Sequence, residues 1–472
     1  MTGEEARTLY AQGEEPTVEK LLEQDARIQE LLAQRATDSH NSSKPPSTDG
    51  FLKPAPKSRR KKTGRKPGGQ KGHAGSTLSL SDTPDHVILH PVNTCSCCDR
   101  DLSAQVADDV ERRQVLDMPP LQMEVIEHRF EVKTCSDCLT ITSSANGAPE
   151  GVSAPVQYGP RIKALGVYLK TYQLLPFKRS AELIRTLVGG SLCEGTLANM
   201  VNKVSDSLDA PLAAILDILA DAKVAQFDET GASVGGKRHW VHVASTKKVT
   251  LYTTHEKRGA AAMDAMGVLP KFKGRAIHDH WKPYYTYKKC RHGLCNAHHL
   301  RELTFVHEQM GQSWARLMKD HLLQIKSEVD VAKAANLTAL DGTMIASLVR
   351  RYKAIIAKGL VSNPAPVPFP GRRGKPKDTK AGNLVRRLKG HRREVLAFMY
   401  DFSVSFENNL AERDLRMMKV QQKISGTFRG GDGGGVFCRI RSYLSTARKH
   451  SLSTLDVLAM AIAGAPFIPK SE

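Results

Sequence analysis

Two aspartates close expected β-strands in the middle of the 472-residue chain. Asp228 ends the run VAQFD, and Asp279 ends the run GRAIHD. If these strands pair side by side, the two carboxylates face each other, and both stay ionised only when cations lie between them. Hard oxygen ligands with room for water favour Mg²⁺. The sequence thus predicts a magnesium site at these two residues.

A third carboxylate is expected from a helix further along the chain. In FENNLAERDLRMMKVQQKISGTFR, Asn408, Glu412 and Arg416 lie four residues apart and share one helical face. Glu412 alone could instead form a surface salt bridge with Arg416. Together with the two aspartates it completes a candidate site for two metal ions.

The elements that must position these acids read as three strands, a helix and a further strand. The strands are VAQFD, KRHWVHVAS, KVTLYTTH and GRAIHD, with the helix over 259–269 before the last of them. This is the opening order of the ribonuclease H-like fold. We expect a ribonuclease H-like α/β catalytic domain over 223–310 and 395–450. The separation of 133 residues between Asp279 and Glu412 fits a helical insertion with a basic segment over 311–394.

Two cysteine knuckles, CSCC and CSDC, precede this domain. Four thiolates form a closed tetrahedral zinc site that can hold together a small β-unit with little core. The alternating stretch MEVIEHRFEVK between the knuckles predicts a strand, so a zinc ribbon is expected over 85–145. Free buried thiols are the alternative, and Cys97 could replace a ligand in the first knuckle. The predicted ligands of the structural zinc are Cys95, Cys98, Cys135 and Cys138.

The other regions complete a multidomain α+β chain. Residues 1–40 predict an N-terminal helix or short coiled coil, which either self-associates or packs on its own chain. Residues 155–222 predict a helical DNA-binding region in which a helix-turn-helix and ordinary helix packing are equal alternatives. Residues 451–472 are expected to form a C-terminal tail. The seam of the N-terminal helix consists of Val18, Leu21, Asp25, Ile28 and Leu32.

Positive charge is concentrated in two segments, 53–73 and 371–393, which carry 18 of the 20 surplus charges. This pattern excludes a uniformly basic protein and predicts a globular body with two polyanion-binding arms. The first segment lies in a Pro- and Gly-rich linker, 41–80, expected to be disordered. A solvated spacer is the alternative to nucleic-acid contact. The expected DNA-binding residues of this arm include Lys57, Arg59, Arg60, Lys61, Lys62, Arg65 and Lys66.

Composition also excludes several classes of protein. The longest mainly apolar stretch, 457–468, is too short to span a bilayer, and the acidic N-terminus resembles neither a secretory signal nor a transit peptide. Nine cysteines in a chain without an export signal fit a reducing compartment. We expect a cytoplasmic, nucleoid-associated protein.

Several long motifs extend over almost the whole chain. They are NSSKPPSTDG, GRKPGGQKGHAG, the paired cysteine knuckles, FDETG with the following GKRHWVHVAST, KRG at 257–259, HDHWKPYY, LCNAHHLREL, and NNLAERDLRMMK followed by QKISGTFR. In these motifs the chain resembles transposases of the bacterial insertion sequence sixty-six family, in the subgroup with a single long transposase. The resemblance implies that Asp228, Asp279 and Glu412 are the acidic triad of a DDE transposase.

The implied activity is cleavage of transposon ends, followed by joining of the 3′ hydroxyl to target DNA, with two Mg²⁺ ions. The expected partners are transposon-end and target DNA, a second copy of the chain on DNA, and companion transposition proteins. The basic, Pro-rich segment near 363–377 belongs to the insertion by the same resemblance. Candidate phosphate contacts near the acids are Arg416, Lys423 and Arg429, with solvated surface charge as the alternative.

Two rival functions fit part of the sequence. A zinc hydrolase would use the cluster in and before LCNAHHLREL, although its members appear divided between a strand end and a helix; the resemblance instead implies that Cys295, His298 and Arg301 pack beside the acids. A non-enzymatic zinc-ribbon DNA-binding protein or regulator would explain the features before residue 220 but not the three acids. The candidate zinc cluster is Cys290, His292, Cys295, His298 and His299.

The basic arm gives a first testable prediction. A Gly- and Pro-rich segment offers no rigid helix to a groove, so its charges should contact phosphates rather than read bases. Neutralising Arg59, Arg60, Lys61 and Lys62 together should weaken binding to transposon-end and random duplexes by similar factors. The log–log salt slope should fall by about 3–4 units if all four touch phosphates. Loss confined to transposon ends, with an unchanged slope, would instead show sequence reading in a narrow minor groove.

Overall fold

The computed structural model describes residues 3–35, 37–38, 41–42, 72, 75, 78–149, 151–366 and 378–471. The chain divides into two units, one formed by residues 54–124 and the other by residues 1–53 and 125–472. The DNA-contact residues predicted between Lys57 and Lys66 lie outside the described residues, as does the basic stretch 367–377.

The two cysteine knuckles have the same backbone turn, although they lie in different units. In the first, the Cys95 N–H donates to Arg100 O and the Asp99 N–H donates to Cys95 O, at 2.9 and 3.1 Å. In the second, the Cys135 N–H donates to Thr140 O and the Leu139 N–H donates to Cys135 O, both at 3.0 Å. The fourth residue after the leading cysteine is left-handed in both, with φ of 55° at Asp99 and 57° at Leu139. The shared turn makes Cys98 the counterpart of Cys138.

The strand predicted over 123–133 is mostly wrong. Only its end forms a strand, β1 (Val132–Thr134), which pairs antiparallel with β2 (Ile141–Ser143) around the second knuckle. Directly before it, Glu131 O accepts the N–H of Ser144 at 2.9 Å, but residues 123–131 form no strand, and Val125 and Ile126 are exposed. An alternating pattern forms a stable strand only when a neighbouring strand completes its hydrogen bonds, and residues 123–131 have none among the described strands.

Two helices precede these knuckles, α1 (Gly3–Tyr10) and α2 (Glu14–Arg35), and they contact each other. The apolar members of the expected seam lie on α2. Val18, Leu21, Ile28 and Leu32 are all about half exposed in the single chain. Self-association through this helix stays a prediction.

A helical region follows the second knuckle and shares its core with the C-terminal helices. Val457 and Leu458 are buried against it, so residues 451–472 contain a packed helix as well as the chain end. The region contains α3 (Pro160–Val167), the π-helical turn η3 (Tyr168–Tyr172), α4 (Phe177–Val188), α5 (Glu194–Asp206) and α6 (Asp209–Asp221). The C-terminal helices in this core are α15 (Gly433–Lys449) and α16 (Thr454–Ile462).

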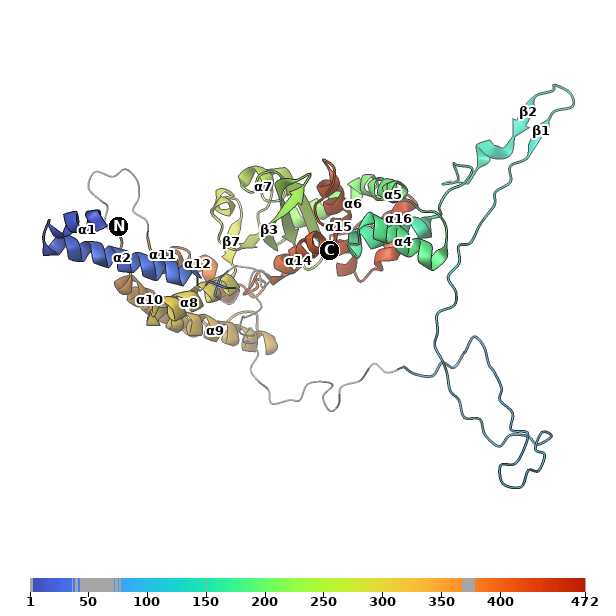
Figure 1. Cartoon of the computed structure of the whole chain (residues 1–472), viewed down its shortest axis with the longest axis horizontal. Helices are drawn as coiled ribbons and strands as arrows, with labels where there is room; N and C mark the ends of the chain where they lie inside the picture. The colour runs from blue at the N-terminus through green and yellow to red at the C-terminus, as the bar shows by residue number, and fades with distance from the viewer. Residues whose placement is uncertain are drawn as a thin grey trace. The chain divides into compact units, whose positions relative to one another are not determined.

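A mixed five-stranded sheet forms the centre of the larger unit (Figure 1). Its order is β5-β4-β3-β6-β7, with antiparallel pairs β3–β4 and β4–β5 and parallel pairs β3–β6 and β6–β7. The strand β7 was not predicted. The expectation of a mixed α/β chain is confirmed. The strands are β3 (Val224–Val234), β4 (Lys237–Ser245), β5 (Thr250–His255), β6 (Arg275–His278) and β7 (Arg291–Leu294).

Alternating side chains of β3 enter two different cores. Ala225 and Phe227 pack in a cluster with residues of α6 and α7 (Ala260–Met266). Ala232 and Val234 pack in a cluster with residues of α14 (Asn409–Ser425) and α15. Because neighbouring residues of a strand point to opposite faces, odd-numbered residues of β3 face α6 and α7, and even-numbered residues face α14 and α15.

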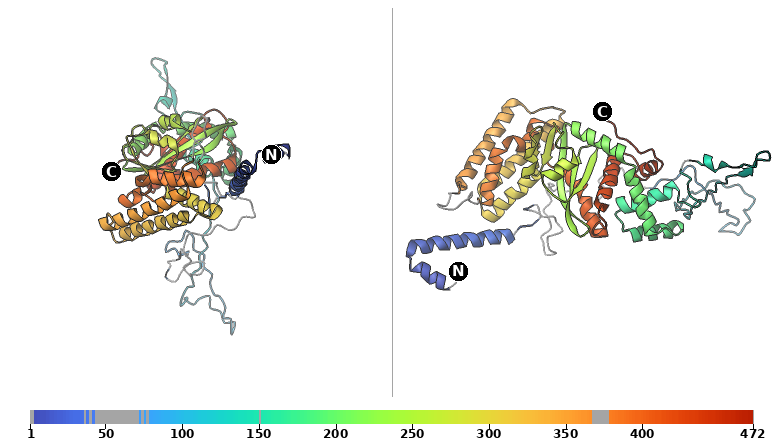
Figure 2. Two further views of the ribbon diagram at one scale, coloured as in Figure 1. Left: turned by 90° about the vertical axis from the view of Figure 1, so that its left-hand side faces the viewer. Right: turned by 90° about the horizontal axis from the view of Figure 1, so that it is seen from above.

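Helices between β7 and α14 form a bundle that continues the core of the sheet (Figure 2). Ile277 and Leu294 belong to the same apolar cluster as the fully buried Trp314. Gly359 permits a close helix contact, since a Cβ there would lie 2.7 Å from Val385 and 2.9 Å from Trp314. The helices are α8 (Asn296–Met310), α9 (Ser313–Ala334), α10 (Gly342–Ser362), α11 (Lys380–Gly390), α12 (Arg392–Val395) and α13 (Ala397–Tyr400).

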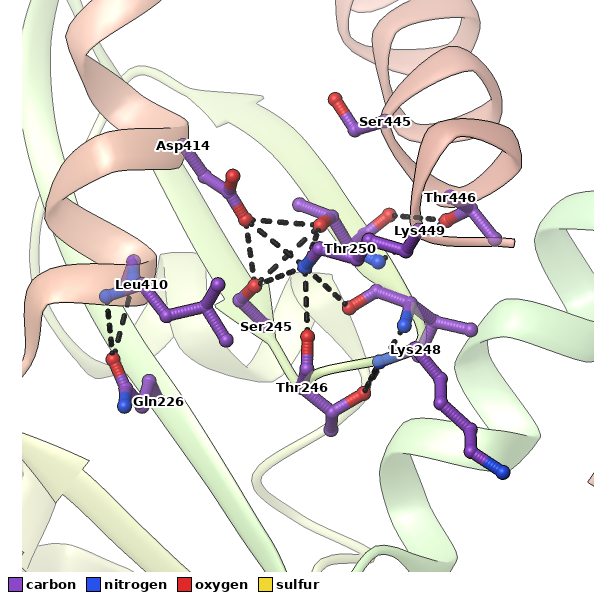
Figure 3. A network of polar contacts seen from close by, with 12 residues as sticks. Gln226, Ser245, Thr246, Lys248, Thr250, Leu410, Asp414, Ser445, Thr446 and Lys449 are labelled. Atoms are coloured by element: carbon purple, nitrogen blue, oxygen red, sulfur yellow. Dashed lines mark hydrogen bonds and ion pairs between the residues drawn. The ribbon is translucent and has the colours of Figure 1, made fainter. Parts of the chain in front are cut away.

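A buried ion pair fixes α14 and α15 to the sheet (Figure 3). The Asp414 carboxylate accepts hydrogen bonds from the hydroxyls of Ser245 at 2.6 Å and Thr250 at 2.9 Å. Lys449 Nζ lies 3.2 Å from the same oxygen and donates to Thr246 O at 2.7 Å. Both charged side chains are less than one fifth exposed, at 13% and 16%. The pair is thus satisfied on all sides by β4, β5 and the turn between them.

Lys449→Met should destabilise the larger unit, because it leaves the buried Asp414 carboxylate without its cation. Two hydroxyl donors remain, so we expect a loss of about 2–4 kcal/mol, somewhat under that for an unsupported buried pair. Urea unfolding followed by tryptophan fluorescence measures it, since Trp240, Trp281 and Trp314 all lie in this unit. Lys247→Met, at an exposed neighbouring position, is the control and should change stability by under about 0.5 kcal/mol. Equal losses in both variants would contradict the role of the pair.

Candidate active site

The register of two parallel strands sets Asp228 beside Asp279. Gln226 of β3 is paired with Ile277 of β6, and each aspartate lies two residues further along its own strand direction. The Asp228 carboxylate accepts the N–H of Glu229 at 2.9 Å, and the Asp279 carboxylate accepts the N–H of Trp281 at 2.9 Å. The two strands that lead to Asp228 and Asp279 are therefore neighbours in the sheet, as expected.

The beginning of α14 is attached to the same segment of β3. The Gln226 side-chain oxygen accepts the N–H groups of Leu410 at 3.0 Å and Ala411 at 3.3 Å, so it caps the first turn of the helix (Figure 3). The Asn408 side-chain amide donates to Phe227 O at 2.8 Å. Glu412 follows in that first turn, on the helix that covers the Asp228 face of the sheet. Asp279 and Glu412 thus lie near enough to Asp228 for their charges to raise its pKa, but among the described residues the ligand atoms of the three acids do not form a group within 4.8 Å of one another.

The charges of these acids repel one another. The pKa of Asp228 is raised well above its ordinary range, first by burial and then by the negative charges of Glu229, Asp279 and Glu412. A divalent cation among these oxygens would remove the repulsion and favour the ionised carboxylates. The donor set, oxygen from three carboxylates, fits Mg²⁺.

A fourth acid, Glu229, was not predicted, and its role differs from that of its neighbour. As an odd-numbered residue of β3 it points to the opposite face, where its side chain is 1% exposed. Its carboxylate accepts from Arg258 Nη2 at 2.7 Å and from the Tyr284 hydroxyl at 2.7 Å. The guanidinium carbon of Arg258 lies 4.1 Å from the ring centre of Trp281. Glu229 is therefore paired with a cation, whereas its neighbour Asp228 accepts a backbone N–H.

Cys295 and His298 lie beside Glu412, as the family resemblance implies. Cys295 Sγ and His298 Nδ1 are each 3.8 Å from Glu412 Oε1. Burial and the negative charge of Glu412 raise the pKa of the Cys295 thiol to about 12. Burial and the charges of Arg301 and Arg387 lower the pKa of His298 to about 3. His298, rather than Arg416, is the basic group within ion-pair distance of Glu412.

The rival cluster for a zinc hydrolase does not converge. Cys290 Sγ donates to Tyr287 O at 3.3 Å, and His292 Nδ1 lies 3.2 Å from His278 Nε2. His299 is buried and bonds to Asn296 at 3.1 Å. Among the residues that the structure describes, the group whose ligand atoms come together is Cys295, His298 and Glu412.

The basic residues proposed near the acids all lie on the surface. Arg416 is exposed on α14, four residues after Glu412, and Lys423 is exposed near the end of the same helix. Arg429 is exposed in the loop after α14 and lines a cavity of about 810 Å³ together with Lys170 and Lys178. These positions leave all three side chains accessible to a phosphate backbone.

Comparison with known families identifies the chain. Residues 155–435, which include the sheet, the helical insertion and α14, match the transposase IS66 family. Residues 93–138 match the zinc-finger binding domain of transposase IS66, which supports structural zinc at the knuckles. Residues 1–79 match a family of unknown function (DUF6444), and no curated protein matches the chain. The chain is a transposase. It belongs to the IS66 family, as its motifs predict.

The helices also bear on membrane association. In the described parts of the chain, none is both long and apolar enough to cross a membrane.

Gln226→Met should show how strongly α14 depends on its cap. The variant keeps the size of the side chain but removes the acceptor of two helix N–H groups, at an expected cost of about 1–2 kcal/mol. Denaturant unfolding is the measurement. Gln309→Met, at an exposed position of α8, is the matched control and should be near neutral. An unchanged midpoint in Gln226→Met would mean that water satisfies the helix end.

Proposed function

We propose that this chain is a DDE transposase that cleaves transposon ends and joins the freed 3′ hydroxyl to target DNA. The observation that supports this most directly is the register of β3 and β6, which aligns Asp228 with Asp279. The attachment of α14 to β3 adds Glu412 as the third acid. A binding protein without catalysis has no need to bring two further carboxylates within repulsive range of Asp228.

The topology supports a ribonuclease H-like catalytic domain. Three antiparallel strands come first, followed by α7 and two strands that add in parallel to the other side of β3. The sequence regions assigned to this domain, 223–310 and 395–450, contain β3 to β7, α14 and α15. The helical insertion falls between them, as in the predicted organisation.

In the proposed mechanism, Asp228, Asp279 and Glu412 would hold two Mg²⁺ ions, which would supply activation of the attacking oxygen and stabilisation of the leaving oxygen in a phosphodiester exchange. Water attacks first and releases a 3′ hydroxyl, which then attacks a target phosphodiester and displaces its 3′ oxygen. No covalent bond to the protein is needed. Glu229 stays bound to Arg258 and Tyr284, which keeps β3 in place on the face away from the metals.

DNA contacts are proposed at several sites. Arg416, Lys423 and Arg429 lie exposed on α14 and the loop after it. The basic arm, the zinc finger and the helical region over 155–222 would bind the transposon end. Action on two DNA ends also suggests a homo-oligomer on DNA, with companion proteins, in a cytoplasmic, nucleoid-associated setting.

Asp228→Asn, Asp279→Asn and Glu412→Gln should each abolish Mg²⁺-dependent nicking and joining of a transposon-end duplex. The amides keep the size of the side chains but remove the charge that binds metal. Binding of the same duplex, measured by fluorescence anisotropy without metal, should stay within about twofold, because the acids do not contact phosphates directly.

Asp320→Asn is the matched control, since Asp320 is an exposed acid of α9. It should cleave like the unaltered protein. Retained cleavage in either aspartate variant would overturn the proposed site. Retained cleavage in Glu412→Gln alone would assign the third ligand to another acid of 394–414. A chain that binds transposon ends but never cleaves them would be the non-enzymatic DNA-binding protein.

A further inference from the structure

Three potential metal ligands meet where α8 begins beside α14. Cys295 is the N-cap residue of α8, His298 lies in its first turn, and Glu412 lies in the first turn of α14. Their ligand atoms all lie within 4.8 Å of one another. Within the described part of the chain, His298 Nδ1 is buried and has no hydrogen-bond partner. A thiol, an imidazole and a carboxylate in one place form a donor set that magnesium chemistry does not require.

The spacing fits a small tetrahedral ion. Zinc bonds of about 2.0–2.3 Å at tetrahedral angles place neighbouring ligand atoms roughly 3.3–3.7 Å apart. Cys295 Sγ and His298 Nδ1 each lie 3.8 Å from Glu412 Oε1, so small side-chain shifts would close the site. A water molecule would take the fourth position.

In the free protein burial and the Glu412 charge keep Cys295 a thiol, but two features would stabilise its thiolate once a metal ion is bound. The N–H of Asn408 donates to Cys295 Sγ at 3.2 Å, and the sulfur lies at the N-terminal end of a helix of 15 residues. Backbone donors and the positive end of a helix both stabilise negative charge on sulfur. Sulfur and imidazole ligands select zinc over magnesium.

We propose that Cys295, His298 and Glu412 form an inhibitory zinc site that competes with catalysis for the Glu412 carboxylate. On binding, a zinc–sulfur bond forms and the thiol proton leaves to solvent, with no change of oxidation state. Glu412 then ligates zinc instead of magnesium. The inhibitory consequence rests on the proposed function, but zinc binding itself does not.

Metal binding tests the site without any assay of activity. The full chain, equilibrated with micromolar free Zn²⁺ under reducing conditions and freed of excess, should hold two equivalents: one at the knuckles and one at this site. Cys295→Ser should hold one. Cys290→Ser is the matched control, because Cys290 is a buried cysteine outside the cluster, and it should keep both. Cys135→Ser should lose the knuckle equivalent alone.

Cobalt(II) identifies the ligands directly. Added to protein whose knuckles hold zinc, Co²⁺ should give a thiolate-to-metal charge-transfer band that Cys290→Ser keeps and Cys295→Ser loses. His298→Ala provides a second variant should Cys295→Ser fold poorly, as judged by its circular dichroism. One equivalent of zinc in the unaltered chain, or a cobalt band that survives Cys295→Ser, would overturn the site.

Inhibition is measured with Mg²⁺ constant and Zn²⁺ increasing, as the ratio of nicking with and without zinc within each protein. The unaltered chain and Cys290→Ser should be inhibited at least tenfold more strongly than Cys295→Ser. Equal inhibition of all three, with the second equivalent present, would show a zinc site that does not regulate. Absence of nicking in every protein, with the second equivalent still bound, would refute the proposed function but not the zinc site.

Discussion

The attachment of α14 to β3 is the constraint on which the candidate site depends. The two aspartates need only a pair of neighbouring strands, but Glu412 comes from a helix that begins after the whole insertion. Gln226 and Asn408 join that helix end to the strand carrying Asp228 through backbone groups that would otherwise be unsatisfied. Because an unsatisfied buried N–H is costly, the helix has one favoured position along the strand.

Two acids of α14 have different surroundings, one in an internal ion pair and the other in the candidate site. Asp414 bonds to Lys449, Ser245 and Thr250, so its charge is compensated inside the protein. Glu412, two residues earlier, lies beside a thiol and an imidazole rather than an arginine or lysine in the contacts of the described residues. The same division separates Glu229 from Asp228 on β3. Internal pairing therefore marks which carboxylates hold the fold and which are left for ligands.

Much of this arrangement could be predicted from the sequence. Asp228 and Asp279 were proposed because each ends an expected strand, and their alignment needed only that these two strands be neighbours. Glu412 was proposed from its helical spacing and from family resemblance. No local sequence pattern indicates which residue, 133 positions after Asp279, comes to lie near it. Glu229 was missed because its partners, Arg258 of a loop and Tyr284 of the 3-10 helix Lys282–Thr286, are brought together only in the folded chain.

The strands show the same limit. β7, RHGL, is short and contains a glycine, so its own pattern carries little information, and its pairing with β6 defines it. Over 123–133 the sequence predicted a strand that mostly does not form, because the clear alternation of apolar and polar residues there has no partner strand among the described residues. Strand prediction from one segment thus fails in both directions when the neighbour decides the outcome.

Because of the long insertion, the third acid is synthesised well after the two aspartates. Glu412 is synthesised 133 residues after Asp279, which at about 5–20 residues per second takes roughly 7–27 s. During this interval the ribosome-bound chain already contains its arm, its cysteine knuckles and both aspartates, but not the third acid. Under the proposed function, a nascent or prematurely ended chain could hold DNA without cutting it. The order of synthesis would then separate attachment from cleavage.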